Sequence, residues 1–579
     1  MMKTQKIPKH LQKYVVNQEY DQYSSIDQAV WRFVMRQNKH FLQNTAHEAY
    51  SKGLESSVIS IDKIPNVDEE MNETLSEIGW GAVNIDGFIP GVVFFDFQAH
   101  GLLPIASDIR KLENIQYTPA PDIIHEAAGH APILYNETFS RYVKLFGEIG
   151  SKALATKEEH EVFEATRDYS NLLESGIASA TEISNAKRVM EQKQSQVTGL
   201  SEAEEISRLY WWTVEYGLVG SITNPKIYGA GLLSSVSEGR NSLTDQVEKI
   251  PFALQKVISS SFDITKPQPQ LFVSEDFAEL IHAVKEFSET MAWKQGGTKS
   301  LEKAIQSART ATIVYSSGLQ VTGTLSSITK NIQGEAIYMK TDGKTSLNSN
   351  NVELFGHSVA THTDGFGSPI GGLRDFVKPL EQWSDNELSR AGIVLNQFCE
   401  LHFASGIIVK GIPVDMVRDK EIIQLISFTN CTVNYKEEVL FQESWGQYDM
   451  AVGSEIISVF AGAADSEAFF ADEVVELNSK VRELQPSPIE NMYSRVRQLR
   501  ENAEYVVELE EVLPDLIDEL TEVSADDWLL RIEILELLLK NDLLPNKQAE
   551  LFSQLEAIRD LKDEYKELID RGLMIIDSE

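Results

Sequence analysis

Two histidines five residues apart and one glutamate in an aromatic run are well suited by type to hold a metal ion. His125 and His130 lie in YTPAPDIIHEAAGH, residues 117–130, and Glu215 lies in RLYWWTVEYGLV, residues 208–219. A carboxylate among apolar side chains is costly to bury unless a cation is paired with it, and a metal would supply that charge. Two imidazoles and one carboxylate leave three coordination positions open, which favours non-haem Fe(II) that activates oxygen.

The spacing of the two histidines differs from that of zinc proteases, which place them four apart on one helical face with a Glu after the first. Glu126 does follow His125 here. On a regular α-helix, residues five apart point about 140° away from each other. We therefore predict that the helix ends near Gly129, so that His130 can turn back toward His125. Asp122, one helical turn earlier, is predicted to accept the second ring proton of His125.

Each part of this pattern also has a structural explanation, which the residues alone leave open. A pair of histidines at this spacing is often structural, and Glu215 could pair with Arg208 or Lys226 instead of a metal. The glutamate after the first histidine could also serve a zinc-dependent hydrolase as general base. The interpretation of these residues as ligands of one metal ion therefore depends on whether folding brings the three side chains to one point.

A second pair of histidines has the same spacing. His357 and His362 lie in GHSVATHTDGFGSPIGG, with Asp364 just beyond. The segment lacks the prolines and the acidic residue that precede His125, and its glycine content is typical of a loop. We predict a surface loop here.

The residue pattern changes along the sequence in a way that predicts a multidomain fold. A mainly α-helical domain is expected over residues 1–300, with a helical insertion at about 151–200. A β-rich domain follows over 305–470, and an acidic α-helical segment over 471–579. QGGTKSLEK, residues 295–303, is expected to be a linker between the first two.

Particular segments carry these expectations. YDQYSSIDQAVWRFVMRQNKHFLQ, residues 20–43, has apolar residues at helical spacing after a Ser-Ser-Ile-Asp start that suits a helix cap. A second helix is predicted in SEDFAELIHAVKEFSETMAW, with Ser274 or Asp276 as its cap. TATIVYSSGLQVTGTL, residues 310–325, predicts strand, turn and strand, and Asp-Gly in EAIYMKTDGKTSL, residues 335–347, predicts a turn.

The last segment is strongly acidic. Residues 471–579 contain 28 Asp and Glu against 12 Lys and Arg. WLLRIEILELLLK, residues 528–540, carries charges at helical spacing and is predicted to be an amphipathic helix. A helical hairpin or an oligomerisation element is expected, so a homo-oligomer formed through these helices is one prediction.

The composition excludes several classes of protein. The chain has 579 residues and a net charge of -36, and such a surface would repel a phosphate backbone, so we expect no nucleic-acid partner. Its two cysteines rule out a disulfide framework and fit a reducing cytoplasm. The N-terminus has no apolar signal region and no stretch is long enough to span a membrane, so a soluble cytoplasmic protein is expected.

Three segments together resemble the pterin-dependent aromatic amino acid hydroxylases. They are YTPAPDIIHEAAGH, RLYWWTVEYGL and IYGAGLLSSVSE, which occur in the order found in that family, and the similarity covers roughly residues 20–300. The resemblance implies a catalytic domain of that type, similar to bacterial phenylalanine 4-monooxygenases. It implies Fe(II) and a tetrahydropterin, such as tetrahydrobiopterin, as cofactors. An insertion between His130 and Glu215 is about as long as the usual interval itself.

The resemblance also assigns residues to roles. It implies that His125, His130 and Glu215 are the iron ligands, with Glu238 in support behind them. The substrate residues that it implies are Arg110, which would bind the amino acid carboxylate, and Thr118, Pro119, Trp211 and Ser234. The pterin residues that it implies are Gly87, Ile89, Phe94, Glu126 and Tyr210. DGFIPGVVFFDF diverges from the family pattern, so Phe95 or Phe97 could replace Phe94 against the pterin ring.

The activity implied is hydroxylation of an aromatic amino acid ring with O2 and a tetrahydropterin. L-Phenylalanine converted to L-tyrosine is the first expectation, which would place the enzyme in phenylalanine catabolism. Tryptophan or tyrosine as substrate is an alternative. A zinc-dependent hydrolase that uses Glu126 as base, and a scaffold without catalytic activity, are two further alternatives.

Overall fold

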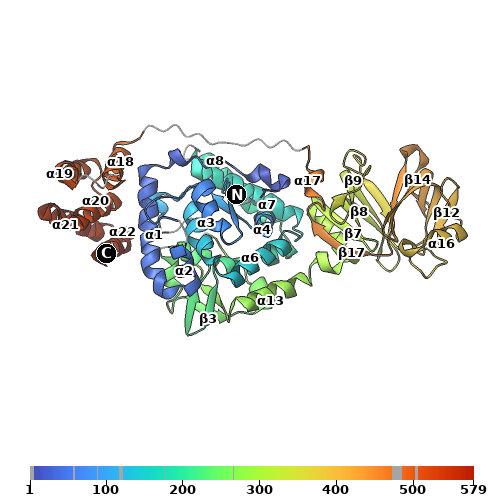
Figure 1. Cartoon of the computed structure of the whole chain (residues 1–579), viewed down its shortest axis with the longest axis horizontal. Coiled ribbons are helices and arrows are strands. Elements are labelled where there is room, and N and C mark those ends of the chain that lie inside the picture. The colour runs from blue at the N-terminus through green and yellow to red at the C-terminus, as the bar shows by residue number, and fades with distance from the viewer. Residues whose placement is uncertain are drawn as a thin grey trace.

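The computed structural model describes residues 6–56, 59–87, 89–116, 121–175, 178–235, 237–264, 266–472, 486–501 and 506–578. Its elements form three groups in a row, with the helical part that contains the N-terminus in the middle (Figure 1). The antiparallel strands lie on one side of this part and the C-terminal helices on the other. Within the described residues, no helix combines the length and the apolarity that crossing a bilayer needs.

The first group begins with a helix whose start was predicted. Ser24 caps α1 (Ser25–Thr45), and Asp27 completes a capping box by accepting from the Ser24 backbone N–H. Asp276, the second of the two predicted caps, accepts from the Glu279 backbone N–H at the start of α13 (Phe277–Ser288). Side-chain oxygens at these positions satisfy backbone N–H groups that the first helical turn leaves unpaired.

The other elements of this group surround a core that runs through the whole middle part. The helices are α2 (Glu48–Ser56), α3 (Asn72–Ser76), α4 (Gly91–Ala99), α5 (Ala131–Ile133), α6 (Glu137–Gly150), α9 (Glu202–Tyr210), α10 (Ala230–Ser234), α11 (Glu238–Asn241), α12 (Leu254–Ser259) and α14 (Ala292–Gln295). Two small sheets complete it: β1 (Gly81–Ile85) parallel to β2 (Leu102–Ala106), and the order β4-β3-β6-β5 from β3 (Leu218–Ser221), β4 (Asn224–Ile227), β5 (Glu248–Pro251) and β6 (Gln270–Ser274).

The predicted insertion contains two helices that pack against each other, α7 (Lys157–Ser175) and α8 (Ala180–Gln194). No residue of α8 is buried, so this hairpin adds little to the core. The segment predicted to be a linker at 295–303 is instead mostly helical, because α15 occupies Gly297–Ser307. Leu301 and Ala304 of α15 are fully buried and join the core beneath the neighbouring sheet, which explains why this stretch folds.

The β-rich zone consists of two antiparallel sheets. One has the order β10-β9-β8-β7-β17 with β11 beside β9, and the other has β12-β13-β14-β15 with β16 beside β14. The strands are β7 (Thr310–Tyr315), β8 (Leu319–Lys330), β9 (Ala336–Ser349), β10 (Val352–Glu353), β11 (Phe366–Pro369), β12 (Cys399–His402), β13 (Ile407–Asp419), β14 (Ile422–Tyr435), β15 (Glu438–Phe441), β16 (Tyr448–Ala451) and β17 (Ile456–Ala461). The short helices α16 (Asp385–Arg390) and α17 (Ser466–Phe469) accompany them.

The predicted strand, turn and strand at 310–325 is confirmed by β7 and β8. The Asp-Gly turn predicted at 335–347 is wrong, because Asp342 and Gly343 lie inside β9. The pairing of β8 with β9 shifts register at this point, and Gly343 has a φ of 70°. A positive φ beside a register shift is typical of a β-bulge, which a dipeptide signal alone does not distinguish from a turn.

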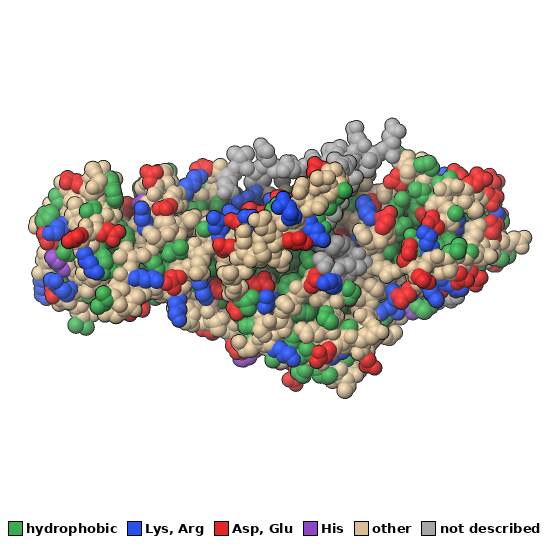
Figure 2. Space-filling model, turned by 180° about the vertical axis from the view of Figure 1, so that it is seen from behind, with side chains coloured by type: hydrophobic (Ala, Val, Ile, Leu, Met, Phe, Trp, Pro, Cys, Tyr) green, Lys and Arg blue, Asp and Glu red, His purple; other side chains and the backbone are tan. Residues whose placement is uncertain are grey.

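The C-terminal helices pack against α1 of the same chain. They are α18 (Pro488–Glu501), α19 (Val506–Val523), α20 (Trp528–Lys540), α21 (Pro545–Leu561) and α22 (Asp563–Ser578), and acidic side chains gather over them at the right of Figure 2. The prediction of an amphipathic helix at 528–540 is wrong, since every residue of α20 from Trp528 to Leu538 is buried. Phe33 of α1 meets Trp528 edge to face at 4.9 Å, so these apolar surfaces are used within the chain.

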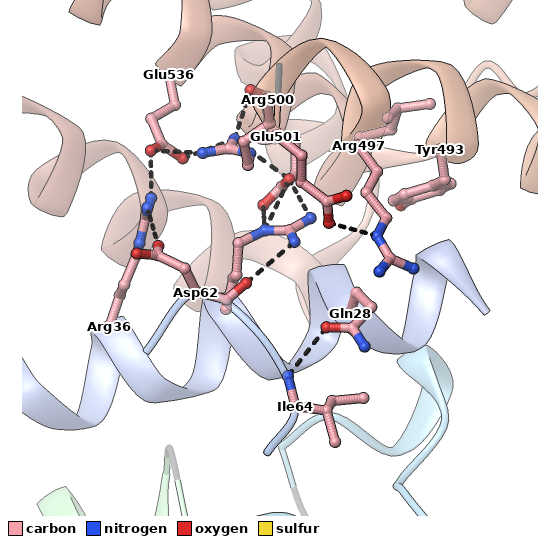
Figure 3. A network of polar contacts seen from close by, with 12 residues as sticks. Gln28, Arg36, Asp62, Ile64, Tyr493, Arg497, Arg500, Glu501 and Glu536 are labelled. Atoms are coloured by element: carbon pink, nitrogen blue, oxygen red, sulfur yellow. Dashed lines mark hydrogen bonds and ion pairs between the residues drawn. The ribbon is translucent and has the colours of Figure 1, made fainter. Parts of the chain in front are cut away.

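A charged network crosses this contact between α1 and the C-terminal helices (Figure 3). Arg32, which is 3% exposed, binds the Glu533 carboxylate through Nε and through Nη2 at 2.6 Å. Arg36 pairs with Glu536, and Arg500 donates to both oxygens of Glu536 at 2.9 and 3.1 Å. The charges of α20 that suggested a solvated face are thus neutralised inside the protein.

Candidate metal centre

The two histidines come together because their segment is not a regular α-helix. His125–His130 forms the π-helical segment η5, which continues directly into α5. In a π-helix the backbone bonds join residues five apart, so those residues lie one above the other. The prediction that the helix ends near Gly129 is therefore wrong, since a change of pitch aligns the two rings.

Gly129 is required for a different reason from the one predicted. A Cβ at this position would lie 2.6 Å from the carbonyl oxygen of Ala230, closer than atoms can pack. Ala230 begins α10, whose last residue is Ser234. The absent side chain therefore lets α10 approach the histidine segment closely.

Glu215 reaches the same point from a second π-helical segment, η6 (Trp211–Glu215). Its Oε2 lies 3.1 Å from Nε2 of His125 and its Oε1 lies 3.1 Å from Nε2 of His130. Ligand atoms at right angles around an ion, with bonds of about 2.1 Å, lie about 3.0 Å apart. The three predicted ligands thus converge with the separation that one metal ion requires.

The alternative partners of Glu215 are occupied elsewhere. Arg208 pairs with Glu204 at 2.9 Å, and Lys226 Nζ donates to the carbonyl of Asn44 at 2.7 Å. Burial by itself would lower the pKa of His125, but the carboxylate of Glu215 raises it to about 9. The same two imidazoles hold the pKa of Glu215 far below its usual value despite burial. The carboxylate is thus ionised and suited to bind a cation together with the two imidazoles.

Ser234 determines which nitrogen of His125 faces the metal position. Its Oγ lies 3.1 Å from His125 Nδ1 and donates its own proton to the carbonyl of Ala230 at 2.8 Å. The ring must then donate through Nδ1–H, which leaves the lone pair of Nε2 directed at the ion. The prediction for Asp122 was wrong in this detail, since its carboxylate accepts from the backbone N–H of His125 at 3.0 Å.

A cavity of about 320 Å³ opens beside these ligands. Of the predicted site residues that the structure describes, all but His130 and Asp122 line it. They are Gly87, Ile89, Phe94, Arg110, His125, Glu126, Tyr210, Trp211, Glu215, Ser234 and Glu238. Thr118 and Pro119 lie outside the described residues.

Arg110 enters the cavity from a buried position and is only 5% exposed. Its Nε and Nη2 donate to the two oxygens of Asp122 at 2.7 and 2.9 Å, and its Nη1 donates to the carbonyl of Ser234 at 3.2 Å. A guanidinium has five N–H donors. Among the described residues these bonds use three, so two donors on the terminal nitrogens remain for a ligand.

Glu126 presents a polar atom to the cavity that lacks a protein partner. Its Oε2 is buried without a hydrogen bond in the described part of the chain and lies 3.8 Å from Nε2 of His130. Burial raises the pKa of Glu126 to about 7. A buried acceptor of this kind suits a ligand that brings its own N–H groups, as a pterin does.

Aromatic rings form part of the wall of the cavity. Trp211 is stacked between Tyr216 and Phe262, each with its ring centre 4.5 Å away. Phe94 packs edge to face on Tyr210 at 5.9 Å. The sequence prediction missed Tyr216 and Phe262. Tyr216 directly follows the predicted ligand Glu215, so the sequence could have indicated it as a cavity residue. Phe262 is distant in the chain, and no motif in the sequence points to it.

Glu238 supports the wall that carries Trp211. Its carboxylate accepts from the Tyr216 hydroxyl at 3.2 Å and from the Gln268 backbone N–H at 2.7 Å. Burial raises the pKa of Glu238 from 4.5 to about 7.

This shift makes the stability of the protein depend on pH. The unfolded chain loses the Glu238 proton near pH 4.5 and the folded chain near pH 7, so the contribution is fully present below pH 4.5 and lost as pH rises through 7. Relative to Glu238→Gln, wild type should lose roughly 3 kcal/mol across this window. Urea unfolding of both proteins at several pH values measures the difference, and a constant difference would contradict the expectation.

Comparison with known proteins agrees with this geometry. The family model described as biopterin-dependent aromatic amino acid hydroxylase matches residues 4–186 and 194–329, more than half of the chain. Phenylalanine-4-hydroxylase of Chromobacterium violaceum is 27% identical over 271 residues, which are 47% of this chain and 76% of that protein. That of Pseudomonas aeruginosa is 27% identical over 278 residues, covering 47% and 89%.

Solved structures match a similar share of the chain. The phenylalanine hydroxylase of C. violaceum with bound oxidised Fe(III) is 26% identical, with a TM-score of 0.38, and covers 47% of this chain and 84% of that one.

The family match and the site agree on the class of enzyme. The family is defined by its dependence on biopterin, and the described residues contain a His-His-Glu group that can hold iron, so the predicted cofactors, iron and a tetrahydropterin, are confirmed. The match also favours hydroxylation over the zinc-dependent hydrolysis that Glu126 had left open. By its sequence and by the ligands at its cavity, the chain belongs to the biopterin-dependent aromatic amino acid hydroxylases.

Proposed function

We propose that this enzyme hydroxylates the ring of L-phenylalanine to give L-tyrosine, with O2 and a tetrahydropterin, and with iron bound by His125, His130 and Glu215. The observation that carries the proposal is one cavity lined both by two of these ligands, His125 and Glu215, and by Arg110, which keeps two N–H donors without a partner among the described residues. The relatives named phenylalanine-4-hydroxylase support the choice of substrate.

The residues of the chain orient the reactants, and the cofactors supply the reactivity. A bound tetrahydropterin would supply two electrons which, with the two from the C–H bond of the ring, would reduce O2 to one ring hydroxyl and one water. Ser234 keeps the Nε2 lone pair of His125 directed at the metal. Placement and exclusion of water are the tasks left to the protein.

The substrate carboxylate is assigned to Arg110. Asp122 fixes the guanidinium from one side with two bonds, so its remaining donors are held in place before a ligand arrives. A planar pair of N–H groups matches the two oxygens of a carboxylate. Trp211, which lines the same cavity, then offers an apolar surface for the substrate ring.

The pterin is assigned to the part of the cavity lined by Gly87, Ile89, Phe94, Glu126 and Tyr210. Phe94 is half-buried against Tyr210 and can present its ring to a flat heterocycle. The unpartnered oxygen of Glu126 can accept an N–H group of the pterin.

We also propose how the chain is divided into domains. Residues 1–300 form the catalytic domain, which includes the helical insertion at about 151–200. The β-rich zone at 305–470 is a second domain, and residues 471–579 are an acidic helical segment that packs on α1 of the first. A cytoplasmic location and a homo-oligomer remain predictions.

Anaerobic reconstitution with Fe(II) tests the function directly. Addition of oxygen, a tetrahydropterin and L-phenylalanine should produce L-tyrosine, measured by chromatography, in proportion to the iron bound. L-Tryptophan and L-tyrosine are offered in parallel reactions. A higher kcat/KM for either of these would replace phenylalanine as the substrate, and no product from any of them would contradict the proposal.

Arg110→Lys tests the carboxylate contact without leaving Asp122 unpaired. A lysine retains the charge but loses the planar fork, so KM for phenylalanine should rise about 10- to 100-fold while the iron content stays normal. Arg141→Lys, an exposed arginine on α6, is the matched control and should behave as wild type. An unchanged KM in Arg110→Lys would refute the assignment.

A further inference from the structure

A second group of metal-binding side chains lies in the β-rich zone. His357 and His362, which the sequence suggested were in a surface loop, are instead mostly buried, with side chains 8% and 9% exposed. The third member is Asp449 on β16, far away in the sequence. Asp364, the acid nearest to the pair in the sequence, is exposed and does not take part.

The three side chains direct one atom each toward a common point. His357 Nδ1 lies 3.3 Å from His362 Nε2, and the Oδ2 of Asp449 lies 3.7 and 3.8 Å from these two nitrogens. The distances to Asp449 are too long for hydrogen bonds. A point equidistant from the three atoms lies about 2.1 Å from each, which is the length of a bond from zinc to nitrogen or oxygen.

Neighbouring groups hold the carboxylate in this orientation. Its other oxygen, Oδ1, accepts from the Ser427 hydroxyl at 2.5 Å and from Gln447 Nε2 at 2.9 Å. Asp449 is 7% exposed, and its only ion-pair partners within the described chain are the two histidines. A buried carboxylate without a lysine or an arginine is costly unless another cation neutralises it.

Backbone hydrogen bonds also hold the two histidines in place. The N–H of Leu347 donates to the carbonyl of His357 and the N–H of Thr345 donates to that of His362, both at 3.0 Å. Both donors belong to β9, in the six-stranded sheet, whereas Asp449 belongs to the other sheet through β16. The cluster thus joins the two sheets at one point.

We propose that His357, His362 and Asp449 bind a divalent transition-metal ion, Zn²⁺ first among them, as a cross-link between the two sheets. Two imidazoles and a carboxylate are ligands that zinc accepts, and a water molecule would take the fourth position. Because such a site does not exist in the unfolded chain, the binding energy stabilises the fold. The proposal does not depend on the reaction assigned to the first site.

Metal content distinguishes the two sites. Wild type purified without added chelator and analysed by mass spectrometry should contain iron and close to one equivalent of zinc per chain. Asp449→Asn retains the shape of the side chain but weakens a ligand, and should lower the zinc at least tenfold while iron and tyrosine formation persist. Asp364→Asn, at an exposed residue, and His402→Gln, at a partly exposed residue of the same zone, are matched controls and should retain both metals.

A titration with Co²⁺ keeps the test valid if a purified variant is poorly loaded. His125→Ala, which lacks a ligand of the first site, should bind one equivalent with the visible absorption of four-coordinate cobalt. Addition of His362→Ala to this variant should abolish that band, with circular dichroism confirming that the double variant is folded. Absence of the band from His125→Ala, or its survival in the double variant, would overturn the proposal, as would unchanged zinc in Asp449→Asn.

Discussion

Glu215→Ala is expected to lose iron and tyrosine formation together, with activity reduced by more than about 100-fold. Loss of a residue that only orients a ligand costs 10- to 100-fold in metal affinity or activity, and a ligand itself contributes more. Glu215 is also the shared partner of both histidines, so the variant removes the one carboxylate that lies close to both imidazoles. Metal analysis and turnover on one preparation measure both effects.

Glu126→Gln is the matched control for this prediction. It changes a buried carboxylate in the same cavity, but one that is assigned to the pterin and not to the metal. Iron should be retained, and KM for the pterin should rise. Full iron and full turnover in Glu215→Ala would show that the ligand assignment is wrong, and loss of iron in Glu126→Gln would show that it is incomplete.

The second large effect is expected at the contact between α1 and the C-terminal helices. Glu533→Ala leaves the guanidinium of Arg32 buried without its carboxylate, since Nε and Nη2 both bind Glu533. Removal of one partner of a buried pair costs about 3–5 kcal/mol in the free energy of unfolding. Chemical denaturation followed by circular dichroism measures the loss.

A surface pair in the same helices provides the comparison. Glu519 binds Arg495 at 2.9 Å, but both side chains are more than 40% exposed, so Glu519→Ala should cost no more than about 1 kcal/mol. Replacing Arg32 by Met and Glu533 by Leu together should recover much of the lost stability, because neither charge of this pair is then buried without the other, and Arg36 and Arg500 still have Glu536. Equal losses in Glu533→Ala and Glu519→Ala would contradict the role given to the network.

The sequence predicted the ligands of the first site better than it predicted the backbone that positions them. His125, His130 and Glu215 were identified by residue type, by burial cost and by resemblance to a family. The π-helical pitch of η5 was not, because periodicity analysis assumes the pitch of a regular α-helix. The sequence analysis singled out Gly129, but glycine is needed there because of a close contact with Ala230, which is distant in the sequence.

Charged residues were the main source of error elsewhere. The pattern of α20 was taken as a solvated face, whereas Glu533 and Glu536 are buried against arginines of α1 and α18. The partner of His357 and His362 is Asp449, about 90 residues away, so local spacing could not reveal it. Both errors have one origin: a charge that is neutralised by a distant residue looks the same in sequence as a charge that faces water.

The position of α1 has a consequence for attempts to shorten this protein. One side of the helix contacts the C-terminal helices, and on another Asn38 donates to the carbonyl of Leu233, next to Ser234. Removal of the residues from 486 onward would expose Arg32, Phe33 and their neighbours on α1, the same helix that supports the iron site. We therefore expect the two ends of the chain to unfold as one cooperative unit, and the catalytic half to be unstable without the C-terminal helices.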